Sequence, residues 1–180
     1  MQVFGFAGFS GSGKTTLIEQ LIPRFVAMGR TVSLIKHAHH RFDVDRPGKD
    51  SYRHREAGAS EVLIASAHRW VLMHELRGRA EPELSDHLAC LSPCDLVLVE
   101  GYKSAAIPKL EVHRPSTGKP ALWPQDPHIV AIASDVPAER LRIEGLAPTL
   151  PVLDLADPGA ITLFITDFLA SRHVPTIATA

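Results

Sequence analysis

The sequence predicts an α/β protein with a mostly parallel sheet, helices on the faces of the sheet and one antiparallel excursion. Two short apolar runs, at residues 2–8 and 31–37, flank a glycine-rich loop and a stretch with helical periodicity. This order of strand, loop, helix and strand is a βαβ unit, which joins two parallel strands. A third run, "DLVLVEG" at residues 95–101, is apolar enough to be a strand buried on both faces.

A helix is expected directly after the glycine-rich loop. Its apolar side chains recur at helical spacing, at Leu17, Leu21, Phe25 and Met28. Gly29 follows this pattern, and glycine is the residue that most often ends a helix.

The rest of the chain alternates between further strand and helix patterns. Two apolar runs at 60–67 and 69–76 stand so close together that they predict an antiparallel hairpin. Further helices are expected at 51–59, 81–91 and 158–172, and further strands at 108–114, 128–135 and 151–155. We interpret residues 1–173 as a single domain and residues 174–180 as a flexible tail.

Composition narrows the class of protein. The 180 residues are 45% hydrophobic and 22% charged, which is typical of a globular domain. The formal net charge of -1 gives no general attraction to nucleic acid or to an anionic membrane, so any anion site must be local. With only two cysteines and no apolar run long enough to span a bilayer, a cytoplasmic location is expected.

The glycine-rich loop carries a phosphate-binding motif. Gly8, Gly13, Lys14 and Thr15 match every fixed position of G-x-x-x-x-G-K-[ST], between a predicted strand and a predicted helix, so we expect the P-loop NTPase fold. Successive backbone N–H groups of such a loop form an anion nest at a helix N-terminus. Lys14 should reach the β- and γ-phosphates, and the Thr15 hydroxyl should ligate Mg²⁺. The residues expected to hold the nucleotide are Gly8, Ser10, Gly11, Ser12, Gly13, Lys14, Thr15 and Thr16.

Three acidic residues are candidates for the metal side of this site. Glu100 ends the run at residues 95–101, and ligands of open α/β sheets bind at the carboxyl ends of the strands. Asp43 and Asp45 form a D-x-D pair that would face one side of an extended segment, although a solvated acidic loop explains the pair equally well. We expect Lys14, Glu100 and Asp45 to act in catalysis, and Thr15, Asp43, Asp45 and Glu100 to contact Mg²⁺. Asp95, at the other end of the same run, is expected to be structural.

Three histidines follow the second predicted strand. His37, His39 and His40 stand beside Lys36. Such a cluster can bind zinc or nickel, or it can donate to a phosphate or to a protein partner. The pattern leaves both alternatives open.

Three segments together resemble the MobB family, the adapters of molybdopterin guanine dinucleotide biosynthesis. They are "GFSGSGKTTL", "KHAHHRFDVDRPGKDSYRHREAGA" and "DLVLVEGYK", in this order, and the likeness extends to "IVAIASD". The resemblance implies a P-loop fold, binding of GTP and Mg²⁺, a homodimer, weak GTPase activity and a role beside the molybdopterin guanylyltransferase. It further implies that residues 11–16 carry the phosphates and that Glu100 faces Mg²⁺.

The choice of base does not follow from the usual guanine motif. The chain contains no asparagine and no [NT]-K-x-D sequence. Asp135, at the end of the run at residues 128–135, is the best candidate to accept from guanine. Two other functions remain open: an ATP-dependent kinase or ligase of the dethiobiotin synthetase type, and a metallochaperone GTPase that uses the histidines.

Overall fold

The computed structural model describes residues 1–38, 42–143 and 145–172. The chain groups into two compact units, and each is described by itself below: a first unit of residues 1–37 together with the chain from His87 on, and a second unit of residues 38–86. The predicted single domain over residues 1–173 therefore stays a prediction. The predicted tail at 174–180 lies outside the described residues, as do His39 and His40.

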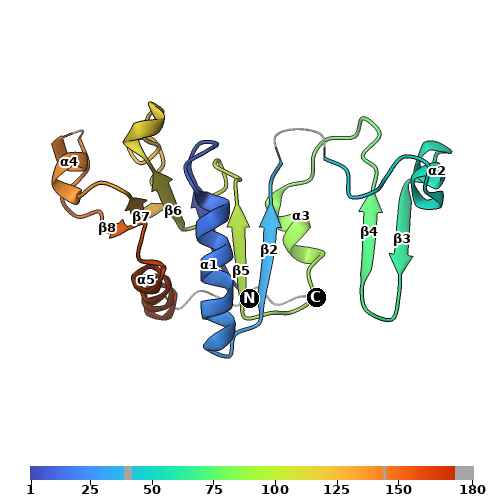
Figure 1. The fold of residues 1–180 in the computed structure, drawn as a ribbon, viewed down its shortest axis with the longest axis horizontal. Coiled ribbons are helices and arrows are strands. Elements are labelled where there is room, and N and C mark those ends of the chain that lie inside the picture. Colours follow the sequence, from blue (N-terminus) through green and yellow to red (C-terminus); the bar gives the residue numbers. More distant parts are fainter. Residues whose placement is uncertain (39–41, 144, 173–180) are drawn as a thin grey trace. The chain divides into compact units, whose positions relative to one another are not determined.

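The first unit is built on a parallel six-stranded sheet, which confirms the predicted fold class (Figure 1). Its strand order is β2-β5-β1-β6-β7-β8, and every neighbouring pair is parallel. The strands are β1 Gln2–Ala7, β2 Val32–Lys36, β5 Leu96–Glu100, β6 Lys109–His113, β7 Ile129–Ser134 and β8 Val152–Asp154. The α-helices within the described residues, those of the second unit included, are α1 Lys14–Ala27, α2 Asp50–Glu56, α3 Leu84–Ala89, α4 Ala138–Ile143 and α5 Pro158–Ser171.

Two long helices cover one face of this sheet. Helices α1 and α5 lie side by side across it (Figure 1). Phe4 and Phe6 point to this face, and they pack with Leu21 and Ile165 in a fully buried cluster. The predicted end of the first helix is confirmed, because α1 stops before Gly29, whose φ of 80° suits glycine.

Loops cover part of the opposite face of the sheet, and β6 supplies polar side chains to hold them. Leu110 and Val112 point to the helices, whereas Lys109, Glu111 and His113 alternate to the other face and are also buried. A smaller apolar cluster, built from residues of β7, α4 and the segment at 122–123, completes this face. A buried polar row is stable only when its groups are paired, so these side chains must find partners in the loops.

Lys109 ties two loops to the sheet. Its side chain is fully buried, and its Nζ donates to Lys103 O at 2.9 Å, to Ala105 O at 2.6 Å and to Asp126 Oδ2 at 2.8 Å. The stem crosses β1 at Gly5, where a Cβ would lie only 2.6 Å from Lys109 Cγ. A side chain at position 5 would therefore displace the lysine and the loop that it holds.

Glu111 holds the second loop. Its two carboxylate oxygens accept from the backbone N–H groups of Leu122 and Trp123, both at 2.8 Å. Burial raises the pKa of Glu111 to about 7, although these two donors oppose the rise and Lys103 opposes it further. The loop at residues 122–123 is thus fixed by an acid that prefers to be protonated near neutrality.

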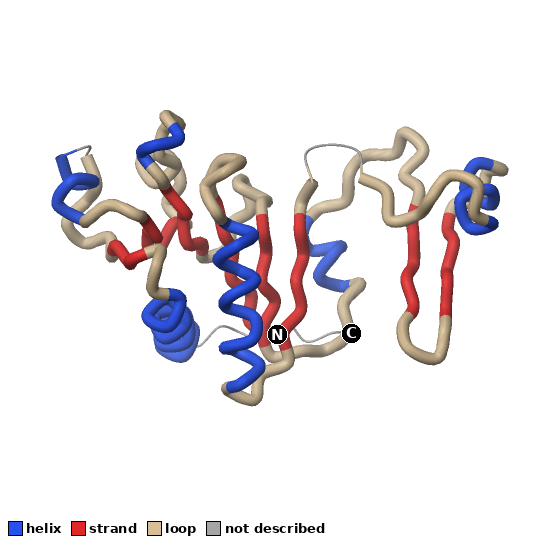
Figure 2. The backbone as a smooth tube through the Cα atoms, viewed as in Figure 1, coloured by secondary structure: helices blue, strands red, loops and turns tan. Residues whose placement is uncertain are grey.

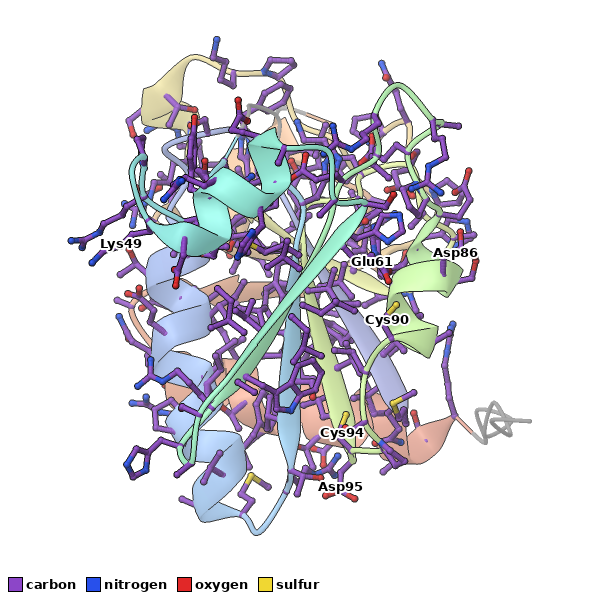
Figure 3. All side chains as sticks on the ribbon, turned by 90° about the vertical axis from the view of Figure 1, so that its right-hand side faces the viewer. Lys49, Glu61, Asp86, Cys90, Cys94 and Asp95 are labelled. Carbon is purple, nitrogen blue, oxygen red and sulfur yellow. The ribbon has the colours of Figure 1, made fainter. Side chains whose placement is uncertain are left out.

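The opposite end of the sheet is fastened by Asp95, just before β5. Its Oδ2 accepts from the backbone N–H of Thr31 at 2.8 Å and from the Thr31 hydroxyl at 2.7 Å. Figure 3 shows Asp95 next to Cys94, where the chain enters β5. The geometry agrees with the structural role predicted for Asp95.

The second unit contains the predicted hairpin. Strand β3 Glu61–Ala65 pairs with β4 Trp70–His74 in an antiparallel two-stranded sheet (Figure 2). In this pairing Leu63 stands opposite Leu72. Helix α2 precedes the hairpin. It ends two residues before Gly58, which has a φ of 114°.

Replacing Lys109 with methionine should destabilise the protein by about 3–5 kcal/mol, because the change leaves a carboxylate and two carbonyls without their buried cation. Chemical denaturation at pH 7 measures the loss. Lys119→Met, at an exposed lysine, is the matched control and should cost less than about 0.5 kcal/mol. Equal stability of the two variants would contradict the assigned role of Lys109.

The raised pKa of Glu111 predicts that the protein becomes less stable as the pH rises through this range. Between the usual carboxyl value of 4.5 and about 7, the folded protein keeps a proton that the unfolded chain has lost. The contribution of Glu111 to the free energy of unfolding should therefore fall by about 3 kcal/mol over this pH interval. Above pH 7 this contribution should not fall further. Glu111→Gln should remove this part of the slope, whereas Glu139→Gln, at an exposed carboxyl, should leave it unchanged. Denaturant titrations from pH 4.5 to 8 make the comparison.

Candidate functional site

The phosphate-binding motif lies in the loop between β1 and α1, as its sequence predicts. Gly8 has a φ of 140°, and a Cβ there would lie 2.5 Å from Val112 O, so β6 excludes any side chain at this position. Gly13, with a φ of 99°, caps the N-terminus of α1. The loop therefore brings backbone N–H groups to the positive end of a 14-residue helix, which favours an anion.

Lys14 bends back over this loop. Its Nζ donates to Gly8 O at 3.0 Å and to Phe9 O at 2.9 Å. Burial lowers the pKa of the Lys14 ammonium, Glu100 raises it, and Lys103 and Lys36 lower it further. The ammonium is thus fixed beside the loop in a partly desolvated position, where its attraction for a phosphate is stronger than in water.

The structure brings Thr15 and Glu100 together. Strand β5 lies between β1 and β2, so Glu100 ends next to Phe6 and Lys36. Thr15 Oγ1 donates to Glu100 Oε1 at 2.7 Å, and Lys36 Nζ lies 3.2 Å from Glu100 Oε2. A hydroxyl and a carboxylate are the hard oxygen ligands that Mg²⁺ prefers, so this pair fits the metal. Glu100 is held within the site, because only 8% of its side chain is exposed.

Lys103 joins this site from the loop after β5, although no motif of the sequence marks this residue. Its Nζ lies 4.1 Å from the centroid of the Phe9 ring, over the phosphate loop. Three lysines, at positions 14, 36 and 103, therefore share one part of the fold with a single glutamate. Their excess positive charge supplies the local anion site that the net charge of the chain does not indicate.

Arg114 is a second residue that the sequence analysis missed. It follows β6 directly, and its Nε donates to Ser12 O at 3.0 Å while its Nη1 donates to Asp135 Oδ2 at 2.9 Å. Asp135, the candidate guanine acceptor, follows β7, the strand next to β6. The position of Arg114 at the carboxyl end of a strand beside β1 is the signal that could have identified it.

The other predicted acids lie in the second unit and surround Arg55. Both oxygens of Asp43 accept from Arg55 Nη2, at 2.9 and 3.0 Å, and Asp45 Oδ2 lies 3.5 Å from Arg55 Nε. A backbone hydrogen bond from Asp45, followed by the Arg55 guanidinium, lowers the pKa of Asp43. Glu75 adds a third carboxylate, 2.9 Å from Arg55 Nη1. The D-x-D pair is thus part of an ion-pair network, and its predicted roles toward Mg²⁺ stay predictions.

Of the predicted histidine cluster, only His37 lies among the described residues. Its backbone N–H donates to Glu100 O at 2.9 Å, and its ring lies 4.8 Å from the Tyr102 ring. Gly101 lies against it, since a Cβ there would be 2.9 Å from His37 Cβ. Among residues 1–38, 42–143 and 145–172, no three histidine, cysteine or acidic side chains are grouped to hold a metal.

No helix in the described part of the chain is long and apolar enough to cross a bilayer.

Comparison with known proteins identifies the family. The family model described as "Molybdopterin guanine dinucleotide synthesis protein B", MobB, matches residues 3–135. The chain is 46% identical over 174 residues to a "Molybdopterin-guanine dinucleotide biosynthesis adapter protein" of Haemophilus influenzae, covering 95% of this chain and 91% of the relative. It is 39% identical over 174 residues to the protein of the same name from Escherichia coli, covering 95% of both chains.

A solved structure agrees with these matches. The crystal structure of a MobB homologue from Bacillus stearothermophilus is similar with a TM-score of 0.67 and 27% identity, and the match covers 96% of this chain and all of the other. Sequence and fold lead to the same conclusion: the chain belongs to the MobB family of molybdopterin guanine dinucleotide synthesis proteins.

Proposed function

We propose that this protein is a GTP-binding adapter of molybdopterin guanine dinucleotide biosynthesis, with slow intrinsic GTPase activity. The contact of 2.7 Å between the Thr15 hydroxyl and Glu100, beside the phosphate loop, is the observation that carries the nucleotide part of the proposal. The adapter role rests on relatives that carry this name and match 95% of the chain.

The residues of the first unit divide the work of holding the nucleotide. The N–H groups of residues 8–16 bind the phosphates, and Lys14 adds a fixed positive charge. Thr15 and Glu100 would hold Mg²⁺, which supplies neutralisation of the β- and γ-phosphate oxygens when it is bound. Lys36 and Lys103 raise the positive potential around the same loop, and Asp135 is our candidate for the guanine acceptor.

The chain also offers a surface for self-association. One face of the hairpin carries Leu63, Leu72 and Trp70, which are 59%, 46% and 63% exposed. An isolated two-stranded sheet is marginal in water, and its edges attract further strands. We propose a homodimer that uses this face. The guanylyltransferase of the pathway and other molybdenum-cofactor proteins are the proposed partners of the dimer.

Family membership favours the adapter over the other two functions that the sequence leaves open. A kinase or ligase of the dethiobiotin synthetase type would share the phosphate loop, but the family match extends through residue 135 and includes the second sequence motif. The metallochaperone alternative depends on His37, His39 and His40, and the last two lie outside the described residues.

Lys14→Ala should abolish measurable binding of GTP while the protein stays folded, because the variant loses the ammonium that is bonded to Gly8 and Phe9 of the loop. Isothermal calorimetry with GTP and Mg²⁺ gives the affinity, and circular dichroism checks the fold. Lys119→Ala is the control at an exposed lysine. An affinity of Lys14→Ala close to that of the unmodified protein would refute nucleotide binding at this loop.

Single-turnover hydrolysis of GTP by the isolated protein should be far slower than about 1 s⁻¹. An arginine that stabilises the transition state raises such hydrolysis rates by a factor of about 10³–10⁵. Arg114, which contacts the loop, is already bonded to Ser12 and Asp135. Glu100→Gln and Asp45→Ala should weaken Mg²⁺-dependent binding more than they alter this small rate. A rate above about 1 s⁻¹ would instead indicate a self-sufficient enzyme.

The protein should be a dimer at micromolar concentration, and Leu72→Glu should make it a monomer by placing charge on the exposed apolar face. Multi-angle light scattering measures both states. Leu163→Glu, at a 60% exposed leucine of α5 far from the hairpin in sequence, controls for the added charge. A monomeric unmodified protein would contradict the proposed dimer.

A further inference from the structure

Arg114 makes two contacts at the carboxyl edge of the sheet. Its Nε donates to the carbonyl of Ser12, inside the phosphate loop, and its Nη1 forms an ion pair with Asp135, at the end of β7. The side chain is 37% exposed, so the guanidinium lies over the carboxyl edge of the sheet and not in the core. One side chain therefore joins the loop assigned to the phosphates to the residue assigned to the base.

The contact with the loop fixes the orientation of a peptide group. A Cβ on Gly13 would lie 3.5 Å from Arg114 Nε and 3.6 Å from Nη2, so the guanidinium covers this glycine closely. In a trans peptide the carbonyl and the following N–H point in opposite directions. A bond to the Ser12 carbonyl therefore turns the N–H of Gly13 away from Arg114, and N–H groups with a fixed direction are what an anion nest requires.

The contact with Asp135 fixes a carboxylate without using up its acceptors. Arg114 Nη1 bonds to Oδ2 only, and each carboxylate oxygen has two lone pairs. Both oxygens thus keep the capacity to accept from the N1–H and N2–H₂ of guanine. Because the two opposite charges cancel, Arg114 adds little net attraction for a triphosphate, and its contribution must come from geometry.

We infer that Arg114 is a positioning residue of the nucleotide site: it holds the phosphate loop and the base-recognising carboxylate in one fixed arrangement, so that GTP binds to both at once. This inference rests on the proposed function. It predicts that loop binding and base selectivity are coupled through a single side chain, which neither a purely structural arginine nor an independent phosphate ligand would produce.

The test compares Arg114→Ala with Arg114→Lys and with the control Arg30→Ala. Arg30 is bonded to Gln2, at the amino end of β1, away from the phosphate loop. Calorimetry should show that Arg114→Ala binds GTP about 10- to 100-fold more weakly, the effect of losing hydrogen bonds from a charged donor. Lysine should recover less than half of the lost binding free energy, because an ammonium lacks the rigid fork that reaches both partners. Arg30→Ala should bind GTP normally.

Base selectivity supplies the second readout. Asp135→Asn should shift preference from GTP toward xanthosine triphosphate, which has an oxygen in place of the guanine amino group. In the Arg114→Ala background, the same change should shift the preference at least threefold less. Inorganic tripolyphosphate, which probes the loop alone, should also bind more weakly to Arg114→Ala.

The outcomes separate the inference from the function on which it rests. Binding of GTP by Arg114→Ala within threefold of the unmodified protein, full recovery by lysine, or an Asp135→Asn shift independent of residue 114 would overturn the inference alone. Absence of GTP binding by the unmodified protein would refute the proposed function and the inference with it. If Arg114→Ala unfolds below the assay temperature, Asp135→Ala breaks the same ion pair, and unchanged GTP binding by that variant overturns the inference.

Discussion

The buried ammonium of Lys109 is the contact on which the organisation of the first unit depends. Helices α1 and α5 cover one face of the sheet, but loops cover part of the other, and a loop cannot satisfy its own backbone groups as a helix does. Lys109 binds two carbonyls of the loop after β5 and the carboxylate of Asp126, and Glu111 binds two N–H groups of the segment at 122–123. Polar side chains of β6 thus hold the covering loops on this face, whereas apolar packing holds the helices on the other face.

The same contacts of β6 position the residues of the candidate nucleotide site. The loop held by Lys109 follows Glu100 and carries Lys103, whose ammonium lies over Phe9 of the phosphate loop. Arg114 continues the chain directly after the buried polar row of β6. A chain with a formal net charge of -1 therefore gathers several cations at one edge of its sheet, because the strands that end there are anchored in a fixed register.

The second unit is held together by different contacts. Its ion pairs centre on Arg55, which contacts three carboxylates, while one face of its hairpin exposes leucine and tryptophan side chains. Exposed ion pairs contribute little stability each, but a network around one guanidinium specifies how the segment before α2 and the end of β4 meet. The second unit therefore exposes an apolar hairpin face, whereas the first unit exposes the phosphate loop before α1.

The sequence by itself determined the phosphate loop, the order of the strands and the family, because these depend on local spacing: glycines that need positive φ and the periodicity of apolar residues. Helix α4 was not predicted from the sequence. The sequence also placed Glu100 at the carboxyl end of β5, since the end of an apolar run can be recognised in the sequence alone. It did not identify Lys103 and Arg114, and it did not show that Asp43 and Asp45 meet Arg55. These contacts join residues of different elements, up to 102 positions apart for Arg114 and Ser12. Only the tertiary structure decides these contacts, because the sheet order β5-β1-β6 brings together the ends of strands that lie far apart in the sequence.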